Sequence, residues 1–271
     1  MRKLAFFALS IGIAGIFLNA HAQTPAASRD EPVVLADTEQ ASYNWAGYVA
    51  DTASQYSAVS ASWIVPSVSG QEGSDLSADA TWVGIGGVDT HDLIQTGTQA
   101  LVQNGSVVYQ AWWEALPGVS QPLALRVSPG DSVTAAITYI EQGQWSITLI
   151  NNTTGKRAHV TIAYNSSFSS AEWVEEAPSL ATNRGHRPLI PLTHFGAVAF
   201  SGAYTVADGK AVSLGDAGAQ PLRMVGWGGT TLAAPSVIGS NGRFSVVESD
   251  VAQVATLPAQ RQRVVILQQS L

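Results

Sequence analysis

Apolar and polar residues alternate with a period of two along most of the chain, and no stretch keeps a helical period. This alternation is typical of β-strands that bury one face. In residues 93–103, for example, one face carries Gln95, Gly97 and Gln99. The pattern predicts strands at residues 43–49, 56–65, 81–85, 93–103, 106–115, 123–127, 132–141, 145–151, 158–164, 171–177, 195–200, 211–214, 222–225, 245–247 and 263–268.

Turn sequences separate the predicted strands. Asn104-Gly105 is a strong two-residue hairpin signal. Residues 67–80 are rich in Ser, Gly and Asp and are predicted to form a loop. Successive hairpins predict an antiparallel, all-β fold, and sandwiches of roughly 200–250 residues occur as one unit. We therefore expect a single domain over residues 41–271.

The N-terminus has the pattern of a secretory signal. Two basic residues precede an apolar run at residues 4–18, which is followed by Ala20-His21-Ala22. The run is shorter than the ~20 residues of a membrane-spanning helix, so we expect residues 1–22 to be cleaved. Residues 23–40, rich in Ala, Pro, Asp and Glu, are predicted to be a flexible leader or short propeptide. We expect an extracellular or periplasmic protein that is free of the membrane once the signal is removed.

Composition excludes several classes of function. Hydrophobic residues make up 46% of the chain and charged residues 12%, which allows a large core. The net charge is −7, and Lys and Arg form no cluster, which argues against nucleic acid and anionic membranes as partners. Sparse charge also fits a protein that works in acid, where surface ion pairs are lost.

Neither a disulfide nor a metal site is expected. The chain has no cysteine, so stability must come from core burial even in an oxidising compartment. The histidines after the predicted signal show no metal-ligand spacing: they are His91, His159, His186 and His194. We therefore expect no metal and no cofactor.

Three sets of polar residues could carry chemistry. Gln95 has an uncharged amide that can both donate and accept, although a lone glutamine is more often a solvated sheet residue. Gln110, Trp112 and Glu114 share one strand face, which suits a binding cleft and equally an ordinary wet face. Residues 171–176 carry three carboxylates, which a solvated edge strand would also explain.

Alternation assigns the carboxylates of residues 171–176 to two faces. Glu172 and Glu176 fall on one face, together with Val174. Trp173 and Glu175 fall on the other.

Several motifs, in the same order, resemble those of the glutamic peptidases, also called eqolisins. Asn44-Trp45-x-Gly47 resembles that family's Asn-Trp-Gly-Gly. Residues 82–87 and 93–97 are similar to its Trp-Val-Gly-Ile-Asp-Gly and Ile-Leu-Gln-Thr-Gly, and residues 109–114 to its Tyr-Asp-Ala-Trp-Tyr-Glu. Residues 171–176 resemble Ala-Glu-Phe/Trp-Ile-Ile/Val-Glu. The resemblance extends from Asn44 to the C-terminus.

The resemblance implies a fold and an activity. The fold would be a concanavalin A-like sandwich of two large, curved antiparallel sheets. The activity would be that of a secreted, bacterial-type acid endopeptidase, which acts as a monomer on polypeptides through an activated water and no covalent intermediate. By motif position, the catalytic pair would be Gln95 and Glu176. The same motifs imply substrate-binding or supporting roles for Asn44, Trp45, Trp82, Gln110, Trp112, Glu114 and Glu172.

The chain departs from the family pattern at two carboxylates. Gly86 and Gln110 stand where the motifs have Asp, while Glu114 is retained. The catalytic pair would therefore have fewer carboxylates around it, so we expect a pH optimum less far into acid. The family's cysteines are also absent.

Two carbohydrate functions are alternatives on the same kind of sandwich, because a fold alone does not define a function. In a lectin-like module, an exposed Trp112 would stack on sugar. In a glycosidase, Glu114 would pair with Glu176 or Glu172. Neither alternative gives Gln95 a specific role.

Overall fold

The structure is a computed structural model that describes residues 33–180, 188–249 and 265–266. The predicted signal, residues 1–22, lies outside the described residues. In the described part, strands dominate and the one helical element is a 3-10 turn, η1 (Ser240–Gly242). The expected all-β, antiparallel architecture is therefore confirmed. No helix among the described residues has the length and apolar character needed to cross a membrane.

One sheet, called here the first sheet, is antiparallel throughout. Its neighbouring strands are paired through consecutive antiparallel ladders. The order is β7 (Gln121–Pro122), β6 (Ser106–Ala115), β5 (Ile94–Gln103), β4 (Leu76–Ile85), β11 (Ala171–Glu176), β2 (Trp45–Ala50) and β14 (Gln220–Val225).

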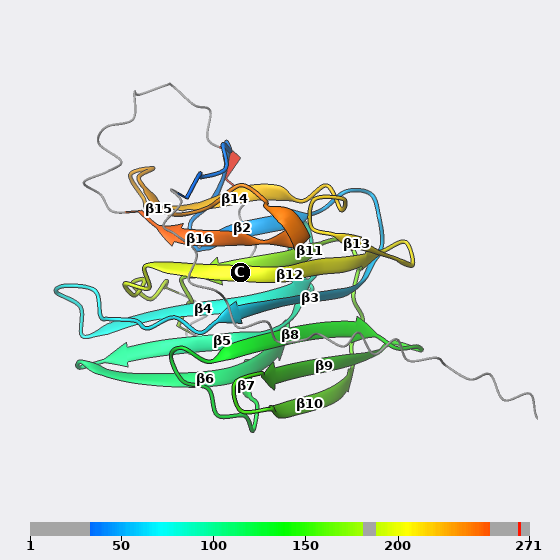
Figure 1. The fold of residues 1–271 in the computed structure, drawn as a ribbon, viewed down its shortest axis with the longest axis horizontal. Coiled ribbons are helices and arrows are strands. Elements are labelled where there is room, and N and C mark those ends of the chain that lie inside the picture. Colours follow the sequence, from blue (N-terminus) through cyan, green and yellow to red (C-terminus); the bar gives the residue numbers. More distant parts are fainter. Residues whose placement is uncertain (1–32, 181–187, 250–264, 267–271) are drawn as a thin grey trace, which may run out of the picture. The chain divides into compact units, whose positions relative to one another are not determined.

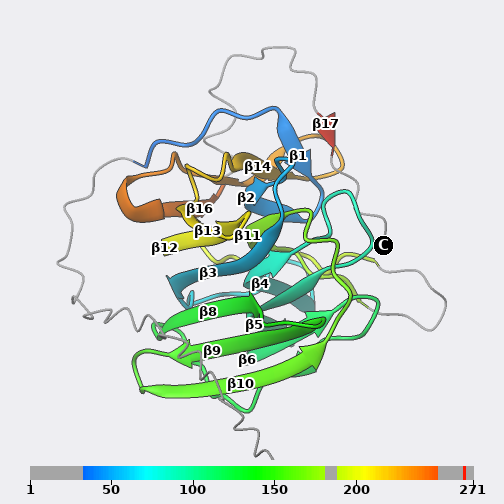
Figure 2. The same ribbon diagram turned by 90° about the vertical axis from the view of Figure 1, so that its right-hand side faces the viewer.

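The second sheet packs against the first (Figure 1). Its order is β10 (Lys156–Ala163), β9 (Gln144–Asn151), β8 (Ser132–Tyr139), β3 (Tyr56–Ile64), β12 (Ala197–Ala207), β16 (Phe244–Glu248) and β15 (Thr231–Pro235), with β13 (Lys210–Ser213) beside β12. In Figure 2, β8, β9 and β10 lie in front of β5 and β6 of the first sheet. Strand β14 joins both sheets, and β1 (Gln40–Ser42) and β17 (Val265–Ile266) add a short parallel edge.

Aromatic side chains fill the space between the sheets and also link them by hydrogen bonds. Trp63 of β3 donates from Nε1 to Thr98 Oγ1 of β5 at 3.0 Å. Trp173 of β11 donates to the carbonyl oxygen of Ser60 on β3 at 3.1 Å. Both indoles are fully buried. Because each buried N–H has an acceptor in the opposite layer, the core fixes how the layers lie on one another.

Several observed strands differ from the predicted ones or were missed, β12 among them, which runs on to Ala207. Strand β4 begins at Leu76, inside the predicted loop, because its inward-facing residues Ser77 and Asp79 are polar and hide the alternation. Residues 123–127 form no regular strand, and the ladder there is only β7. Strand β15 was missed, since it is short and ends in Pro235.

Strand β11 is central, so the edge-strand interpretation was wrong. It pairs with β2 on one side and β4 on the other over its full length. Glu172 and Glu175 are both fully buried, on opposite faces, as the alternation predicts. Carboxylates in a central strand do not shield an open edge. Their burial instead affects their protonation, as described below for Glu175.

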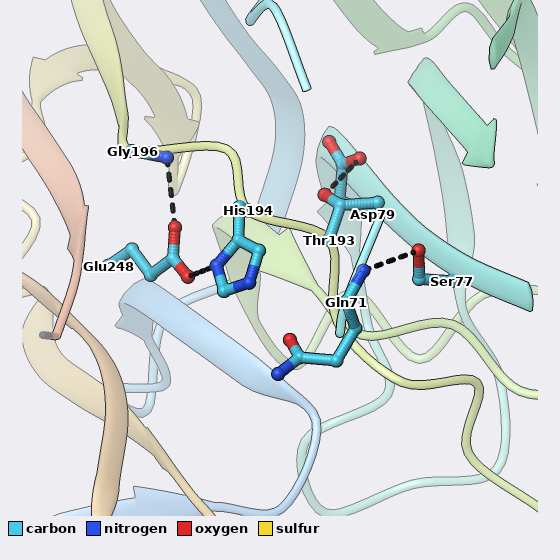
Figure 3. A network of polar contacts seen from close by, with 7 residues as sticks. All are labelled: Gln71, Ser77, Asp79, Thr193, His194, Gly196 and Glu248. Atoms are coloured by element: carbon cyan, nitrogen blue, oxygen red, sulfur yellow. Dashed lines mark hydrogen bonds and ion pairs between the residues drawn. The ribbon is translucent and has the colours of Figure 1, made fainter. Parts of the chain in front are cut away.

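Where β11 ends, the later segment 191–194 takes its place beside β4. Ala78 N donates to Pro191 O at 2.9 Å, and Thr193 Oγ1 donates to Asp79 Oδ1 at 2.8 Å (Figure 3). His194 Nδ1 lies 2.7 Å from Glu248 Oε1, a contact that is an ion pair only while the ring is protonated. These contacts attach the segment to both sheets.

Two carboxyl groups are buried inside this end of the sandwich. Thr81 Oγ1 donates to Glu175 Oε2 at 2.6 Å, and Asp79 lies close by on β4. Burial raises the pKa of Asp79 to about 6. Burial, together with the nearby Asp79 carboxyl, raises the pKa of Glu175 well above its ordinary value. Both groups therefore favour the protonated, neutral form in the folded protein.

The buried acids predict that the protein is more stable in acid than at neutral pH. The folded-state pKa values of Asp79 and Glu175 are raised, so their contribution is fully present below the unfolded values of roughly 4 and is lost as pH rises. For Asp79 alone, a rise to about 6 corresponds to a loss of about 3 kcal/mol. Urea unfolding midpoints should therefore fall between about pH 4 and about pH 7.

The matched variant is Glu175→Gln, which keeps the shape but cannot ionise. Its unfolding midpoint should change less with pH than that of the wild type, since one of the two titrating groups is gone. An exposed control, Glu141→Gln, should keep the wild-type pH dependence. A wild-type midpoint that rises from pH 4 to pH 7 would contradict the assignment.

Candidate active site

A cavity of about 300 Å³ opens on the outer face of the first sheet, away from the core. Its floor comes from neighbouring strands, and its rim comes from residues 118–120 and 178–179. The floor residues are Ala80 of β4, Gln95 and Gln99 of β5, Trp112 and Glu114 of β6, and Glu176 of β11. The residues with the resemblance-implied catalytic roles, Gln95 and Glu176, therefore line one cavity.

Strand register explains why these side chains share a face. Glu176 lies opposite Ala80, and Ala80 opposite Gln99. Gln95 lies opposite Glu114 on β6 and is four residues from Gln99 along β5. Gln95 and Glu176 thus stand on opposite sides of β4 and are offset along the strands. The row between them holds Trp82 of β4, and the small side chain of Ala80 leaves space beside Glu176.

Glu176 is held at its carboxylate by two donors. Trp82 Nε1 donates to Oε2 at 2.8 Å, and Asn44 Nδ2 donates to Oε1 at 3.3 Å. Trp45 packs edge-on against Trp82 with ring centroids 4.7 Å apart, which fixes the donating ring. Burial raises the pKa of Glu176 to about 7, and the charge of Glu114 adds to this, while the bond from Trp82 opposes it.

Gln95 is oriented by Glu114. Its Nε2 donates to Glu114 Oε2 at 2.7 Å, and the side chain is 5% exposed. Among the described residues its Oε1 has no hydrogen-bond partner, although the atom is buried. Buried polar atoms are nearly always paired, so this oxygen is an exception inside the cavity. One amide thus offers a second N–H and an acceptor to whatever the cavity holds.

Close approach of β4 and β5 requires the glycine beside Gln95. A Cβ on Gly97 would lie 2.0 Å from Thr81 O and 2.7 Å from Trp82 Cβ. The glycine therefore does not leave open space beside Gln95. It allows Trp82 to lie against β5 with its indole directed at Glu176.

Glu172 is not part of the cavity. It faces the same side of β11 as Glu176 but is fully buried over Gly84, where a Cβ would lie 3.0 Å from its Oε2. Burial raises its pKa well above the ordinary value. The enclosed carboxyl does not line the cavity, so of the two expected roles only the supporting one stays a prediction for Glu172.

The remaining expected residues have different neighbours. Trp112 is 4% exposed, so it lacks the exposed ring that the lectin alternative requires. Gln110 does not line the cavity directly but accepts a hydrogen bond from Gln99 Nε2 at 2.8 Å. Gln99 was missed as a site residue, although it shares a strand face with Gln95 and the alternation pattern could have found it.

At Gly86, where the family motif has Asp, the carboxylate of Asp92 occupies the space beside the main chain. Gly86 has φ of +84°, a conformation that favours glycine. A Cβ there would lie 2.9 Å from Asp92 Oδ2. Asp92 therefore fills the space that an Asp side chain at position 86 would need. No group of three or more His, Cys, Asp or Glu among the described residues could hold a metal ion.

Comparison with known proteins gives a consistent match. The protein-family model described as "Peptidase A4 family" matches residues 43–246. Aspergillopepsin-2 of Aspergillus niger is 28% identical over 227 residues, covering 75% of this chain and 77% of that protein.

Solved structures agree with this match. Scytalido-glutamic peptidase, solved with a transition state analog inhibitor, has a TM-score of 0.65 and 29% identity, covering 76% of this chain and 98% of that chain. SCP-B, a member of the eqolisin family of peptidases solved with the tripeptide Ala-Ile-His, has a TM-score of 0.62 and 29% identity, with coverage of 76% and 98%.

The bond from Trp82 to Glu176 can be tested by Trp82→Phe. This change keeps an aromatic ring but removes the donor that stabilises the charged carboxylate. The pKa of Glu176 should therefore rise further, by roughly one to two units, because a hydrogen bond to a charged group contributes ~1.5–3 kcal/mol. Carbon-13 NMR of labelled glutamate measures it.

Trp112→Phe is the matched control, because Trp112 Nε1 has no partner among the described residues. It should leave the pKa of Glu176 near the wild-type value. Equal values in the wild type and Trp82→Phe would show that the indole does not act on this carboxyl.

Proposed function

The chain belongs to the Peptidase A4 family and is a glutamic endopeptidase, and from this premise we propose that Glu176 and Gln95 form its catalytic pair. The observation that carries the proposal is their shared cavity, into which two strands direct one carboxyl and one amide. The substrates are polypeptides. Hydrolysis proceeds by attack of a water, with no covalent intermediate.

Glu176 moves the protons. In its ionised form it takes a proton from the attacking water, and the water oxygen bonds to the scissile carbonyl carbon. The same carboxyl then gives that proton to the leaving amine nitrogen as the C–N bond breaks. Trp82 and Asn44 support this cycle because they hold both oxygens of the carboxylate in place.

Gln95 stabilises the charge that develops on the carbonyl oxygen. Glu114 accepts one of its N–H groups and so orients the amide, which leaves the other N–H for the oxyanion. The buried Oε1 can accept from the attacking water. A neutral donor suits this position, since a positive side chain there would lower the pKa of Glu176 and weaken it as a base.

The carbohydrate alternatives lose their support at the same residues. Trp112 is buried, and Glu114, which lines the cavity with Glu176, accepts a hydrogen bond from Gln95. The peptidase proposal gives a role to each of Gln95, Glu114 and Glu176, whereas neither the lectin nor the glycosidase function gives a role to Gln95.

Several finer expectations extend the proposal. We propose that the two sheets have concanavalin A-like curvature, and that the enzyme is exported by the signal at residues 1–22 and acts as a monomer. The leader at residues 23–40 precedes the domain at residues 41–271. Its last part is tied down, because Ala36 N donates to Pro235 O at 2.9 Å. N-terminal sequencing of the exported protein tests the processing, and Met1 at its mature end would contradict it.

The catalytic pair predicts a sharp loss in two variants. Glu176→Gln keeps size and polarity but cannot transfer a proton, so turnover should fall by about 10²–10⁴ or more. Gln95→Ala removes the oxyanion donor and should cost ~10²–10³ in kcat. The assay is cleavage of a denatured protein by folded, purified variants at weakly acidic pH.

The exposed control Glu141→Gln should keep wild-type turnover. Glu175 is unsuitable as a control, because its carboxyl is buried against Thr81. Near-wild-type turnover in Glu176→Gln would exclude this carboxyl as the proton-transfer group.

A second prediction concerns the pH profile. The base form of Glu176 grows as pH approaches about 7, whereas the fold loses stability as pH rises from about 4 through the folded-state pKa of Asp79, about 6, and further as Glu175 ionises. The rate should therefore follow a bell with its maximum in weak acid. Glu175→Gln should extend activity to higher pH, measured after prolonged incubation at each pH. If activity falls at the same pH in this variant as in the wild type, ionisation of Glu175 does not cause the loss of activity at higher pH.

A further inference from the structure

Gln99 and Gln110 form an amide pair at the end of the cavity that holds Glu176. The two residues lie opposite each other on β5 and β6, and Gln99 Nε2 donates to Gln110 Oε1 at 2.8 Å. Gln99 also lies opposite Ala80, which lies opposite Glu176 on the next strand. The pair therefore stands in one row with the catalytic carboxyl, separated from it by one small side chain.

The bond between the amides fixes which atoms remain available. It uses one donor of Gln99 and the acceptor of Gln110. Within the described ranges, Gln99 Oε1 and Gln110 Nε2 make no hydrogen bond, and both side chains are half-exposed. The pair thus presents one acceptor and one donor side by side, with no charge.

This arrangement matches one residue of an extended polypeptide. In an antiparallel pair, a residue directs its own N–H and C=O to the same side and exchanges both bonds with its neighbour. Gln99 Oε1 can accept from that N–H, and Gln110 Nε2 can donate to that C=O. Two side chains would then do what an adjacent strand does for a main chain.

We propose that Gln99 and Gln110 bind the main chain of one substrate residue, a few residues from the scissile bond, and so position the polypeptide for Glu176. This inference rests on the proposed peptidase function. The ligand is an extended, locally unfolded polypeptide, and recognition at this position is independent of its side chain. Both residues are positioning residues, because neither touches the reacting atoms.

The absence of charge in this pair also matters for Glu176. The family motif has Asp at the position of Gln110. A carboxylate in this row would disfavour ionisation of Glu176, whose pKa burial already raises to about 7. An amide at this position can hydrogen-bond the substrate, as a carboxylate could, but carries no charge that would raise the pKa of Glu176 further.

The test combines two variants with a series of peptide substrates. Each peptide carries a single amide-to-ester replacement, which removes one main-chain N–H. Gln99→Ala and Gln110→Ala should each raise KM by about 3- to 10-fold, with kcat near wild type. A hydrogen bond far from the reacting atoms stabilises the bound substrate and the transition state equally, so its loss weakens binding without slowing the chemical step.

The esters identify the contact itself. At one position, the ester should raise KM of the wild type by a similar factor, yet have no further effect on Gln99→Ala. In Gln110→Ala the same ester should still raise KM. Thermal unfolding of both variants should match the wild type, which separates lost binding from lost folding.

Gln103→Ala is the matched control, because Gln103 is an exposed glutamine on the same face of β5 beyond the cavity. Its KM should equal that of the wild type. The inference is overturned if KM is unchanged in Gln99→Ala, or if every ester acts equally in that variant and in the wild type. Full activity of Glu176→Gln would instead count against the catalytic pair, so the two failures are distinguishable.

Discussion

The position of β11 between β2 and β4 is the constraint on which the site depends. Both edges of β11 are paired, so its backbone is fixed and each of its carboxyl groups meets a defined environment. Glu176 faces the cavity, Glu172 is enclosed on the same side, and Glu175 enters the core. Desolvation dominates the behaviour of all three, because no buried cation among the described residues offsets it.

Tryptophans perform structural tasks that disulfides perform in many exported proteins. The chain has no cysteine. Trp63 and Trp173 tie the two sheets together through buried hydrogen bonds, and Trp82 extends the same principle to the site by donating to Glu176. Each indole combines a large buried area with one directional donor. The same residue type therefore stabilises the core and orients the carboxyl that we propose to be catalytic.

Period-two alternation predicted which residues of one strand share a face, but not the whole cavity floor, because Ala80 fell in the predicted loop and Gln99 was missed. It placed Trp112 with Glu114, separated Glu175 from Glu176, and with the Asn104-Gly105 signal defined the hairpin of β5 and β6. Alternation is local, however, and β11 reaches its place by long-range pairing. Its central position, the burial of Glu172 and the raised pKa values therefore could not be predicted from the sequence pattern.

The buried acids give the hydrogen ion the status of an effector. Asp79 and Glu175 favour the folded state when they hold protons, so acidity acts on this protein as a stabilising ligand acts on a receptor. A molecule that leaves an acidic surrounding loses this ligand without any inhibitor or partner being present. The folded state is therefore less stable in neutral surroundings than in acidic ones, and residues of its own core set this difference.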